Sequence, residues 1–293
     1  MLPLVEPWAE CPACETETPR RALHVQRNRK SPLVNGPYYA VIGCERCGLA
    51  YVSPRPTSDA LARYYVDEDR VGWTVRHDEA YAAAKEEKKA RLADRVLAPI
   101  LRARGPGRAL DVGCGAGDIL GALKKAGWET VGIEPHAARR AIAAQHHRLI
   151  EDIPREPTFD LIIVHHVLEH VLAPCDLLRA ARAGALPDAH LLVGVPAFED
   201  VAVTGNLARA CGPVHINGFT GPALRNAIAM AGWVVVSLAG KPLKQDRHVV
   251  YAVATDPQPP EPRCLDEAVG ILRQYGRQLD RSGEFLPVSE SAD

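Results

Sequence analysis

Residues 109–135 read ALDVGCGAGDILGALKKAGWETVGIEP, and this stretch decides the fold. An apolar run reaches Asp111, a turn with three alternating glycines follows, and residues 118–126 have the apolar spacing of a helix. A second apolar run then ends in Glu134. This order of strand, glycine turn, helix and strand is typical of the first unit of a nucleotide-binding sheet, whose ligands lie at the carboxyl edge of the strands.

The glycine turn does not fit the two commonest phosphate sites. Its glycines are Gly113, Gly115 and Gly117. A dinucleotide-binding turn needs a glycine at its sixth position, which holds Asp118 or Leu120 here, and the chain has no Gly-Lys-Ser/Thr sequence for a P-loop. The Asp111 carboxylate would repel a pyrophosphate, but it would attract a ligand with an ammonium and a sulfonium group. The alternative is that this turn is an ordinary tight connection.

Two further acids complete the predicted cofactor site. Glu134 is placed to accept hydrogen bonds from both hydroxyls of a ribose, because an acid at the end of the second strand has this role in nucleotide-binding sheets. Asp152 follows the weak apolar run 147–150, and we expect it to accept a hydrogen bond from an adenine amine.

The apolar runs of the rest of the chain predict a sheet. Runs at 109–112, 130–133, 159–165 and 191–195 alternate with helical stretches, which favours parallel strands covered by helices on both faces. The last two runs, 233–238 and 248–254, are joined by nine residues, too few for a crossover, so they must pair antiparallel. We also expect a helix over 78–104 and a C-terminal helical stripe from Leu265.

Three segments resemble the successive motifs of class I S-adenosylmethionine-dependent methyltransferases: residues 109–135, FDLIIVHHVLEHVLAP at 159–174, and HLLVGVP at 190–196. The resemblance covers about residues 105–255. It implies S-adenosylmethionine as the cofactor, and it places His165 and His166 beside the methyl-donor pocket. The 159–171 segment is especially similar to the fourth-strand segment of small-molecule and sugar methyltransferases.

Four of the eight cysteines form two pairs, Cys11 with Cys14 and Cys44 with Cys47, separated by 29 residues. Four thiolates on two tight turns favour Zn²⁺ in a closed structural site, and they leave no open position for catalysis. Redox-active or merely buried cysteines are the alternatives. The stretch CERCGLAYVSPRP, residues 44–56, is similar to the zinc-binding N-terminal domain of many bacterial methyltransferases, including sugar C-methyltransferases.

These features predict an α/β protein with a Rossmann-like, seven-stranded, mostly parallel sheet whose last strand is antiparallel, which gives the sheet an antiparallel edge. A small zinc-ribbon module precedes it. We expect three parts: a zinc-binding module at 1–75, a cofactor-binding methyltransferase domain at 76–256, and a Pro-rich linker with a C-terminal helix at 257–293.

Histidines are the candidate bases, because methylation of oxygen or carbon requires removal of a proton near neutral pH. His215 lies in a stretch, 211–220, that resembles the loop bearing active-site Tyr, Glu and His in sugar C-methyltransferases, although only the histidine is present here. We expect His215 to be the general base or to hydrogen-bond the substrate, and His166 to be the second candidate, with structural roles as the alternative. His170 is expected to cap or pack a helix, and Glu169 to lie on that helix's surface.

Bulk charge and the N-terminus limit the partners. The net charge of −1 gives no general attraction to a polyanion, and aromatic residues make up only 5%, so nucleic acid is not the expected partner. The first ten residues lack the features of an export signal, and no run reaches about 18 apolar residues. We therefore expect a cytoplasmic monomer or homodimer without membrane contact. Basic residues are concentrated at 20–30, where a solvated face and phosphate binding are both open.

The sequence thus predicts an S-adenosylmethionine-dependent methyltransferase with a structural Zn²⁺ ion. The expected acceptor is a small molecule, such as a sugar, a nucleotide-linked sugar or a natural-product intermediate, with a phosphate-bearing acceptor among the options. O-methylation through a histidine base is the favoured reaction. The alternatives are an RNA or protein methyltransferase that uses the zinc module for recognition, and a non-catalytic cofactor-binding protein.

Overall fold

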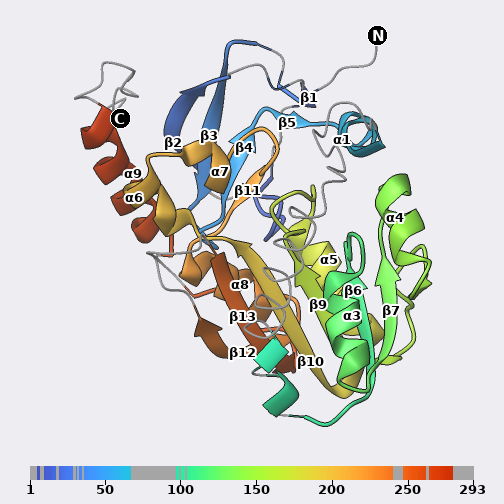
Figure 1. The fold of residues 1–293 in the computed structure, drawn as a ribbon. Helices are drawn as coiled ribbons and strands as arrows, with labels where there is room; N and C mark the ends of the chain where they lie inside the picture. The colour runs from blue at the N-terminus through green and yellow to red at the C-terminus, as the bar shows by residue number, and fades with distance from the viewer. Residues whose placement is uncertain are drawn as a thin grey trace.

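The computed structural model describes residues 5–6, 10–17, 20–28, 31, 33–34, 36–66, 97–98, 100–102, 104–239, 247–261 and 264–279. Its larger sheet has seven strands in the order β12-β13-β10-β9-β6-β7-β8 (Figure 1). Their bounds are β6 Arg108–Val112, β7 Glu129–Ile133, β8 Arg148–Leu149, β9 Phe159–His165, β10 Ala185–Pro196, β12 Trp233–Ala239 and β13 Arg247–Ala254.

The predicted sheet is confirmed, including its antiparallel last strand. The strands from β10 to β8 are parallel, and β13 pairs antiparallel with both β10 and β12. The last strand therefore lies one position inside the sheet, and β12 forms the edge. The short β12–β13 connection makes a hairpin, and the second edge of β13 then pairs with β10, which satisfies backbone groups of both strands.

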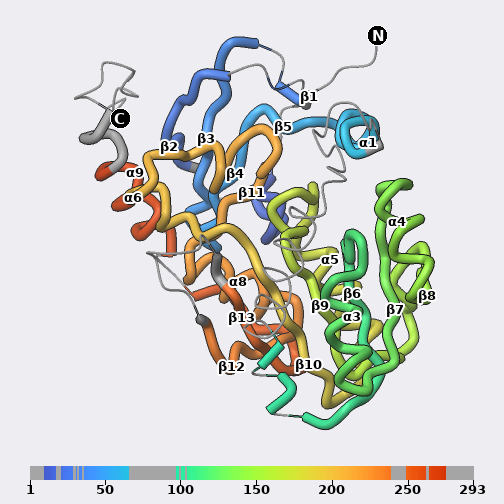
Figure 2. The backbone as a smooth tube through the Cα atoms, in the orientation of Figure 1, coloured from blue at the N-terminus to red at the C-terminus, as the bar shows by residue number. Residues whose placement is uncertain are grey.

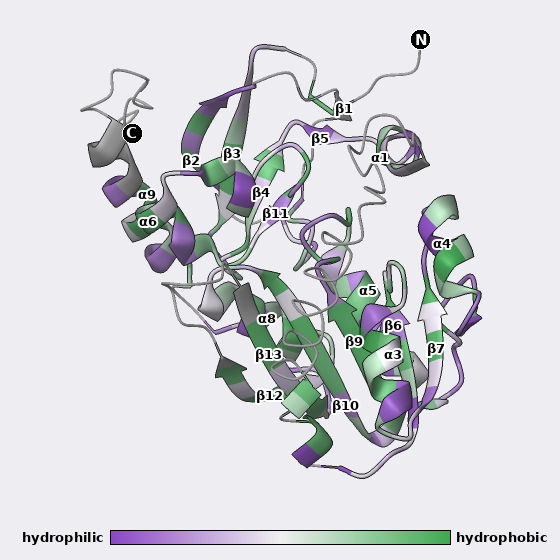
Figure 3. Ribbon diagram, viewed as in Figure 1, coloured by the Kyte–Doolittle hydropathy of each residue, from purple (hydrophilic) through white to green (hydrophobic). Residues whose placement is uncertain are grey.

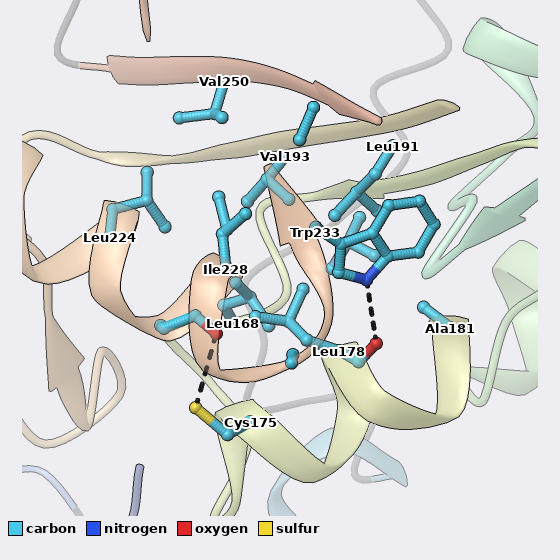
Figure 4. Packing of buried hydrophobic residues seen from close by; sticks show 14 of the residues in the cluster. Leu168, Cys175, Leu178, Ala181, Leu191, Val193, Leu224, Ile228, Trp233 and Val250 are labelled. Atoms are coloured by element: carbon cyan, nitrogen blue, oxygen red, sulfur yellow. Dashed lines mark hydrogen bonds between the residues drawn. The ribbon is translucent and has the colours of Figure 1, made fainter. Parts of the chain in front are cut away.

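Alternate side chains of each strand enter two different cores, as the two-residue period of a strand requires. On one face, Val164 and Val193 pack with α5 (Pro174–Gly184) and α8 (Gly221–Met230). Figure 4 shows this core, where Trp233 Nε1 donates to Leu178 O at 3.2 Å. Figure 3 shows β9 and β10 as mostly hydrophobic.

On the opposite face, Ile163 and Leu192 pack with α3 (Asp118–Lys125) and with Leu97 and Ile100. These last two residues belong to the helix predicted at 78–104, of which 97–98 and 100–102 are helical, while residues 78–96 lie outside the described residues. A further helix, α4 (Ala137–Ala143), follows β7.

The cysteine module has a sheet of its own, in the order β11-β4-β3-β2. Its strands are β2 Arg20–Arg27, β3 Tyr38–Cys44, β4 Ala50–Ser53 and β11 Asn217–Gly218, and two short strands, β1 Val5–Glu6 and β5 Arg55–Pro56, pair beside it. Helix α1 (Ser58–Val66) follows β5.

The fourth strand of this small sheet comes from the half of the chain that forms the large sheet. After β10 the backbone passes through η1 (Phe198–Asp200), α6 (Val201–Thr204) and α7 (Leu207–Ala210) before β11 pairs with β4. Figure 2 shows the path of the backbone from the large sheet into the cysteine module and back to α8.

The C-terminal helix α9 (Leu265–Leu279) packs on the same chain. Its residues Leu265, Ala268 and Leu272 share a buried cluster with Tyr39 and Val41 of β3. The predicted part boundaries at 75 and 256 stay a prediction. Among the described helices, none has the length and apolar character needed to span a bilayer, and the cytoplasmic location also stays a prediction.

Candidate active site

The glycine turn connects the carboxyl end of β6 to the first residue of α3. Gly113 has φ +72°, and a Cβ there would lie 2.6 Å from Val167 Cγ2 in the segment after β9. Gly117 has φ +89° and is the N-cap residue of α3. Both positions therefore require glycine, because side chains rarely adopt this conformation. The Gly113 and Cys114 N–H groups donate to Ile133 O at 2.8 and 3.0 Å, which holds the turn against the end of β7.

Two buried carboxylates lie at this edge. Asp111 is 2% exposed and Glu134 is 4% exposed. Glu134 Oε2 accepts from the Gly115 N–H and Oε1 from the His136 N–H, both at 2.8 Å. These bonds orient the carboxylate, and each oxygen has a second lone pair that can accept from a ribose hydroxyl.

Burial, followed by the Glu134 charge, raises the pKa of Asp111 well above its usual range. A cation bound at this edge would favour the ionised form of Asp111, as expected for a cationic cofactor. Asp152 is exposed and lies three residues after the end of β8, at the same edge of the sheet. Its contact with an adenine amine stays a prediction.

The end of β9 carries two adjacent histidines. The ring of His165 lies so close to Gly194 of β10 that a Cβ at Gly194 would overlap it. His166 has φ +59°, and its N–H donates to Gly194 O at 2.7 Å. The two rings meet edge to face with their centroids 4.6 Å apart. A side chain held at positive φ is uncommon, and such residues concentrate at functional sites.

The structure corrects the predictions for the next segment. Residues 168–170 form a turn, and α5 begins only at Pro174, so Glu169 is not on a helix surface and His170 does not cap a helix. A proline disfavours helical conformation in the residue before it, so it starts the helix rather than continuing one. The Glu169 side chain is fully buried, at 0% exposed.

Glu169 and three histidines converge from two segments of the chain, and we call this group the histidine cluster. Glu169 Oε1 lies 2.8 Å from His166 Nδ1 and 3.7 Å from His170 Nε2. The His170 and His215 rings stand edge to face with their centroids 4.7 Å apart. The structure thus brings together both predicted catalytic histidines, His166 and His215, with two residues that the sequence did not assign to the site.

Hydrogen bonds to backbone carbonyls orient the rings of His170 and His215. His170 Nδ1 donates to Val214 O at 3.0 Å, and His215 Nδ1 donates to Arg209 O. Burial lowers the pKa of His170, which favours its neutral form. The sequence contained one signal for this cluster: a carboxylate, Glu169, between two histidines in the otherwise apolar run 166–172.

Arg55 of β5 is a further residue that sequence reasoning missed. Its side chain is fully buried, and its guanidinium donates to two chain segments. The acceptors are Asn217 Oδ1 and Leu172 O at 3.0 Å, Ile216 O at 3.3 Å and Val171 O at 3.4 Å. Burial lowers the pKa of Arg55 to about 10. Arg55 thereby joins the segment after His170 to the segment after His215.

The four paired cysteines lie together at the base of the small sheet. Cys11 Sγ is 3.7 Å from Cys47 Sγ, Cys14 Sγ is 3.6 Å from Cys44 Sγ, and all four sulfurs lie within 4.8 Å of one another. A tetrahedral zinc ion with Zn–S bonds of about 2.3 Å separates its sulfurs by about 3.8 Å. These residues therefore fit the predicted structural zinc site.

A family comparison identifies the class of this protein. Residues 81–238, more than half of the 293-residue chain, match a family model described as a methyltransferase domain. The chain belongs to this methyltransferase family. The methyltransferase prediction and the Rossmann-like fold class are thus confirmed.

Two curated proteins show how far the sequence similarity extends. Ubiquinone biosynthesis O-methyltransferase from Marinobacter nauticus is 30% identical over 101 residues, 29% of this chain and 42% of that protein. The protein of the same name from Bradyrhizobium diazoefficiens is 28% identical over 97 residues, 29% of this chain and 38% of that protein. The chain therefore spans less than half the length of these relatives.

Two solved structures share the fold. One is the 1,6-didemethyltoxoflavin-N1-methyltransferase of Burkholderia thailandensis with bound S-adenosylhomocysteine, with a TM-score of 0.52 and 19% identity over 71% of this chain and 95% of that one. The other is the magnesium protoporphyrin IX methyltransferase of Synechocystis with bound S-adenosylhomocysteine, with a TM-score of 0.50 and 13% identity over 68% of this chain and all of that one.

Proposed function

We propose that this protein transfers the methyl group of S-adenosylmethionine to an oxygen of a small-molecule acceptor. The observation that carries the proposal is the His166–Glu169 pair, because a histidine backed by a buried carboxylate lies directly beside the glycine turn. A Cβ at Gly113 would contact Val167, the residue that follows His166, so the glycine turn and the His166–Glu169 pair lie at the same edge of the sheet. The O-methyltransferase relatives support oxygen as the acceptor atom.

Two carboxylates are suited to hold the cofactor. Asp111 would face its cationic amino-acid portion, and Glu134 would accept from its ribose hydroxyls. When bound, S-adenosylmethionine supplies a methyl group activated by a sulfonium. Sugar, nucleotide-linked sugar and natural-product acceptors all remain candidates for the pocket.

We propose His166 as the general base, ahead of His215, which the sequence favoured. His166 Nδ1 lies 2.8 Å from a buried carboxylate oxygen, whereas the His215 ring donates to a carbonyl. A buried carboxylate fixes the tautomer of the ring and stabilises the imidazolium that forms when Nε2 takes a proton. The acceptor hydroxyl would thus lose its proton to His166 Nε2 as its oxygen attacks the methyl carbon.

The test is a substitution that respects the backbone of this residue. His166→Asn suits the left-handed conformation, because asparagine tolerates positive φ. We expect kcat to fall by about 100-fold or more, as typical for loss of a general base, while the S-adenosylmethionine affinity is unchanged. Turnover is measured as S-adenosylhomocysteine release with a panel of hydroxylated acceptors, and affinity by calorimetry.

The exposed His146→Asn is the matched control and should keep full turnover. Unchanged turnover of His166→Asn would remove His166 from the mechanism. Calorimetry that detects binding of NAD but none of S-adenosylmethionine would refute the whole proposal.

We further propose that the four cysteines hold one structural Zn²⁺ ion. The spacing of their sulfurs supports the assignment. Metal analysis after dialysis should find about one zinc per chain, and Cys44→Ser should lose it. Less than half an equivalent in the unsubstituted protein would contradict a structural site.

A further inference from the structure

We infer that Glu169, His170 and His215 form a second metal site, which binds a divalent transition-metal ion of the Zn²⁺ or Mn²⁺ type. This site is separate from the cysteine cluster. Its role in positioning the acceptor oxygen rests on the proposed function, but the binding of the ion does not.

Geometry brings three possible ligand atoms together from two distant segments of the chain. One atom from each of these residues lies within 4.8 Å of the other two. A metal with ligands at about 2.1 Å holds neighbouring ligand atoms about 3.0 to 3.5 Å apart. The His170 Nε2 to Glu169 Oε1 distance of 3.7 Å is already close to that range, so small side-chain rotations complete the site.

The hydrogen bonds of the two histidines are those of metal ligands. A ligating imidazole almost always donates its other N–H to a carboxylate, a carbonyl or water, which fixes the tautomer and the ring orientation. His170 and His215 both donate Nδ1–H to backbone carbonyls, at Val214 and Arg209. Nε2 of each ring is then the nitrogen that offers a lone pair to a metal.

The ligand types decide the class of ion. Two imidazoles and one carboxylate are the protein ligands of several catalytic zinc sites and of non-haem iron sites, and three protein ligands leave positions open for oxygen. An acceptor hydroxyl bound there would become more acidic, because a metal lowers the pKa of a coordinated oxygen. His166, beside Glu169, would then take the proton.

The framework around the site is rigid. Arg55 bonds to the residues that directly follow His170 and to those that directly follow His215. A buried cation in this position keeps both ligand segments at a fixed separation. Ligands held by such outer contacts are preorganised for binding.

The experiment titrates zinc-loaded, full-length protein with Mn²⁺ alone, without cofactor or acceptor, and follows free Mn²⁺ by electron paramagnetic resonance. Mn²⁺ prefers nitrogen and oxygen ligands, so it does not replace zinc at four thiolates. We expect one Mn²⁺ per chain. His170→Ala and His215→Ala should each weaken binding at least tenfold, and the exposed His146→Ala should bind like the unsubstituted protein.

A second measurement shows whether a loss of metal binding in a variant comes from misfolding. After saturation with Zn²⁺ and gel filtration, we expect two zinc ions per chain in the unsubstituted protein and one in His215→Gln, with matching circular dichroism spectra. Absence of stoichiometric Mn²⁺ and of a second zinc ion would overturn the inference, as would unchanged binding in the His170 and His215 variants. S-adenosylmethionine affinity of the metal-free protein reports separately on the proposed function.

Discussion

Replacing Arg55 by methionine tests whether a buried cation holds the active-site segments together. Methionine fills a similar volume but donates no hydrogen bonds. Two of the four acceptors keep other donors, since Val171 O also accepts from Asn217 Nδ2 at 2.7 Å and Ile216 O from the Val52 N–H at 3.0 Å. The main loss is therefore the two 3.0 Å bonds to Leu172 O and Asn217 Oδ1.

These two bonds set the expected magnitude. A hydrogen bond to a charged group contributes about 1.5 to 3 kcal/mol, so two contribute about 3 to 6 kcal/mol. Methionine avoids the cost of burying a guanidinium, which offsets part of that loss. We expect a net decrease of about 3 kcal/mol in the free energy of unfolding, equivalent to a Tm lower by roughly 6 to 12 °C.

Urea denaturation and differential scanning calorimetry of the zinc-loaded protein measure the effect. The control is Arg179→Met, because Arg179 also joins the cysteine module to the large domain, through Glu15, but its side chain is 42% exposed. An exposed ion pair contributes about 0 to 1 kcal/mol. A decrease below 1 kcal/mol for Arg55→Met, or one no larger than in the control, would refute the reasoning.

Three further predictions concern the cofactor edge of the sheet. The pKa of Asp111 is raised, so the contribution of this carboxyl to stability is lost as pH rises through that pKa. Asp111→Asn should therefore raise the Tm of the cofactor-free protein at neutral pH. The same variant should weaken S-adenosylmethionine binding at least tenfold by calorimetry. In the unsubstituted protein, that affinity should fall as pH falls through the same raised pKa, because a protonated Asp111 no longer attracts a cationic ligand; an affinity that does not change with pH would contradict this. Gly113→Ala should reduce cofactor affinity, whereas Gly105→Ala, where a Cβ meets open space, should not.

The predictable part of this structure was its local pattern. The glycine turn and the alternating apolar runs predicted the bounds of β6, β7 and β9 to within about one residue. Such bounds are predictable because the burial pattern of a strand depends on its own residues. The sequence could not predict that β13 lies between β12 and β10, because hairpin geometry defines its neighbour on one side only. The strand on its other side depends on the whole sheet.

The missed residues share a physical reason. The prediction of Glu169 on a helix surface is wrong because Pro174 begins the next helix only five residues later, which leaves residues 168–170 in a turn. Arg55 bonds to residues 116 to 162 positions away in the chain, so no local pattern shows its acceptors. Its burial depends on two segments that meet only in the folded protein.

The pairing of β11 with β4 determines where this chain can be cut and which segments must be exchanged together. Because the final strand of the cysteine module is supplied by residues 217–218, cutting the chain near residue 75 would separate a sheet from its own edge. Asn226 of α8 extends the connection by donating to Cys47 O at 3.1 Å. A chimaera that exchanges cysteine modules between related proteins must therefore exchange residues 197–226 together with the N-terminal segment.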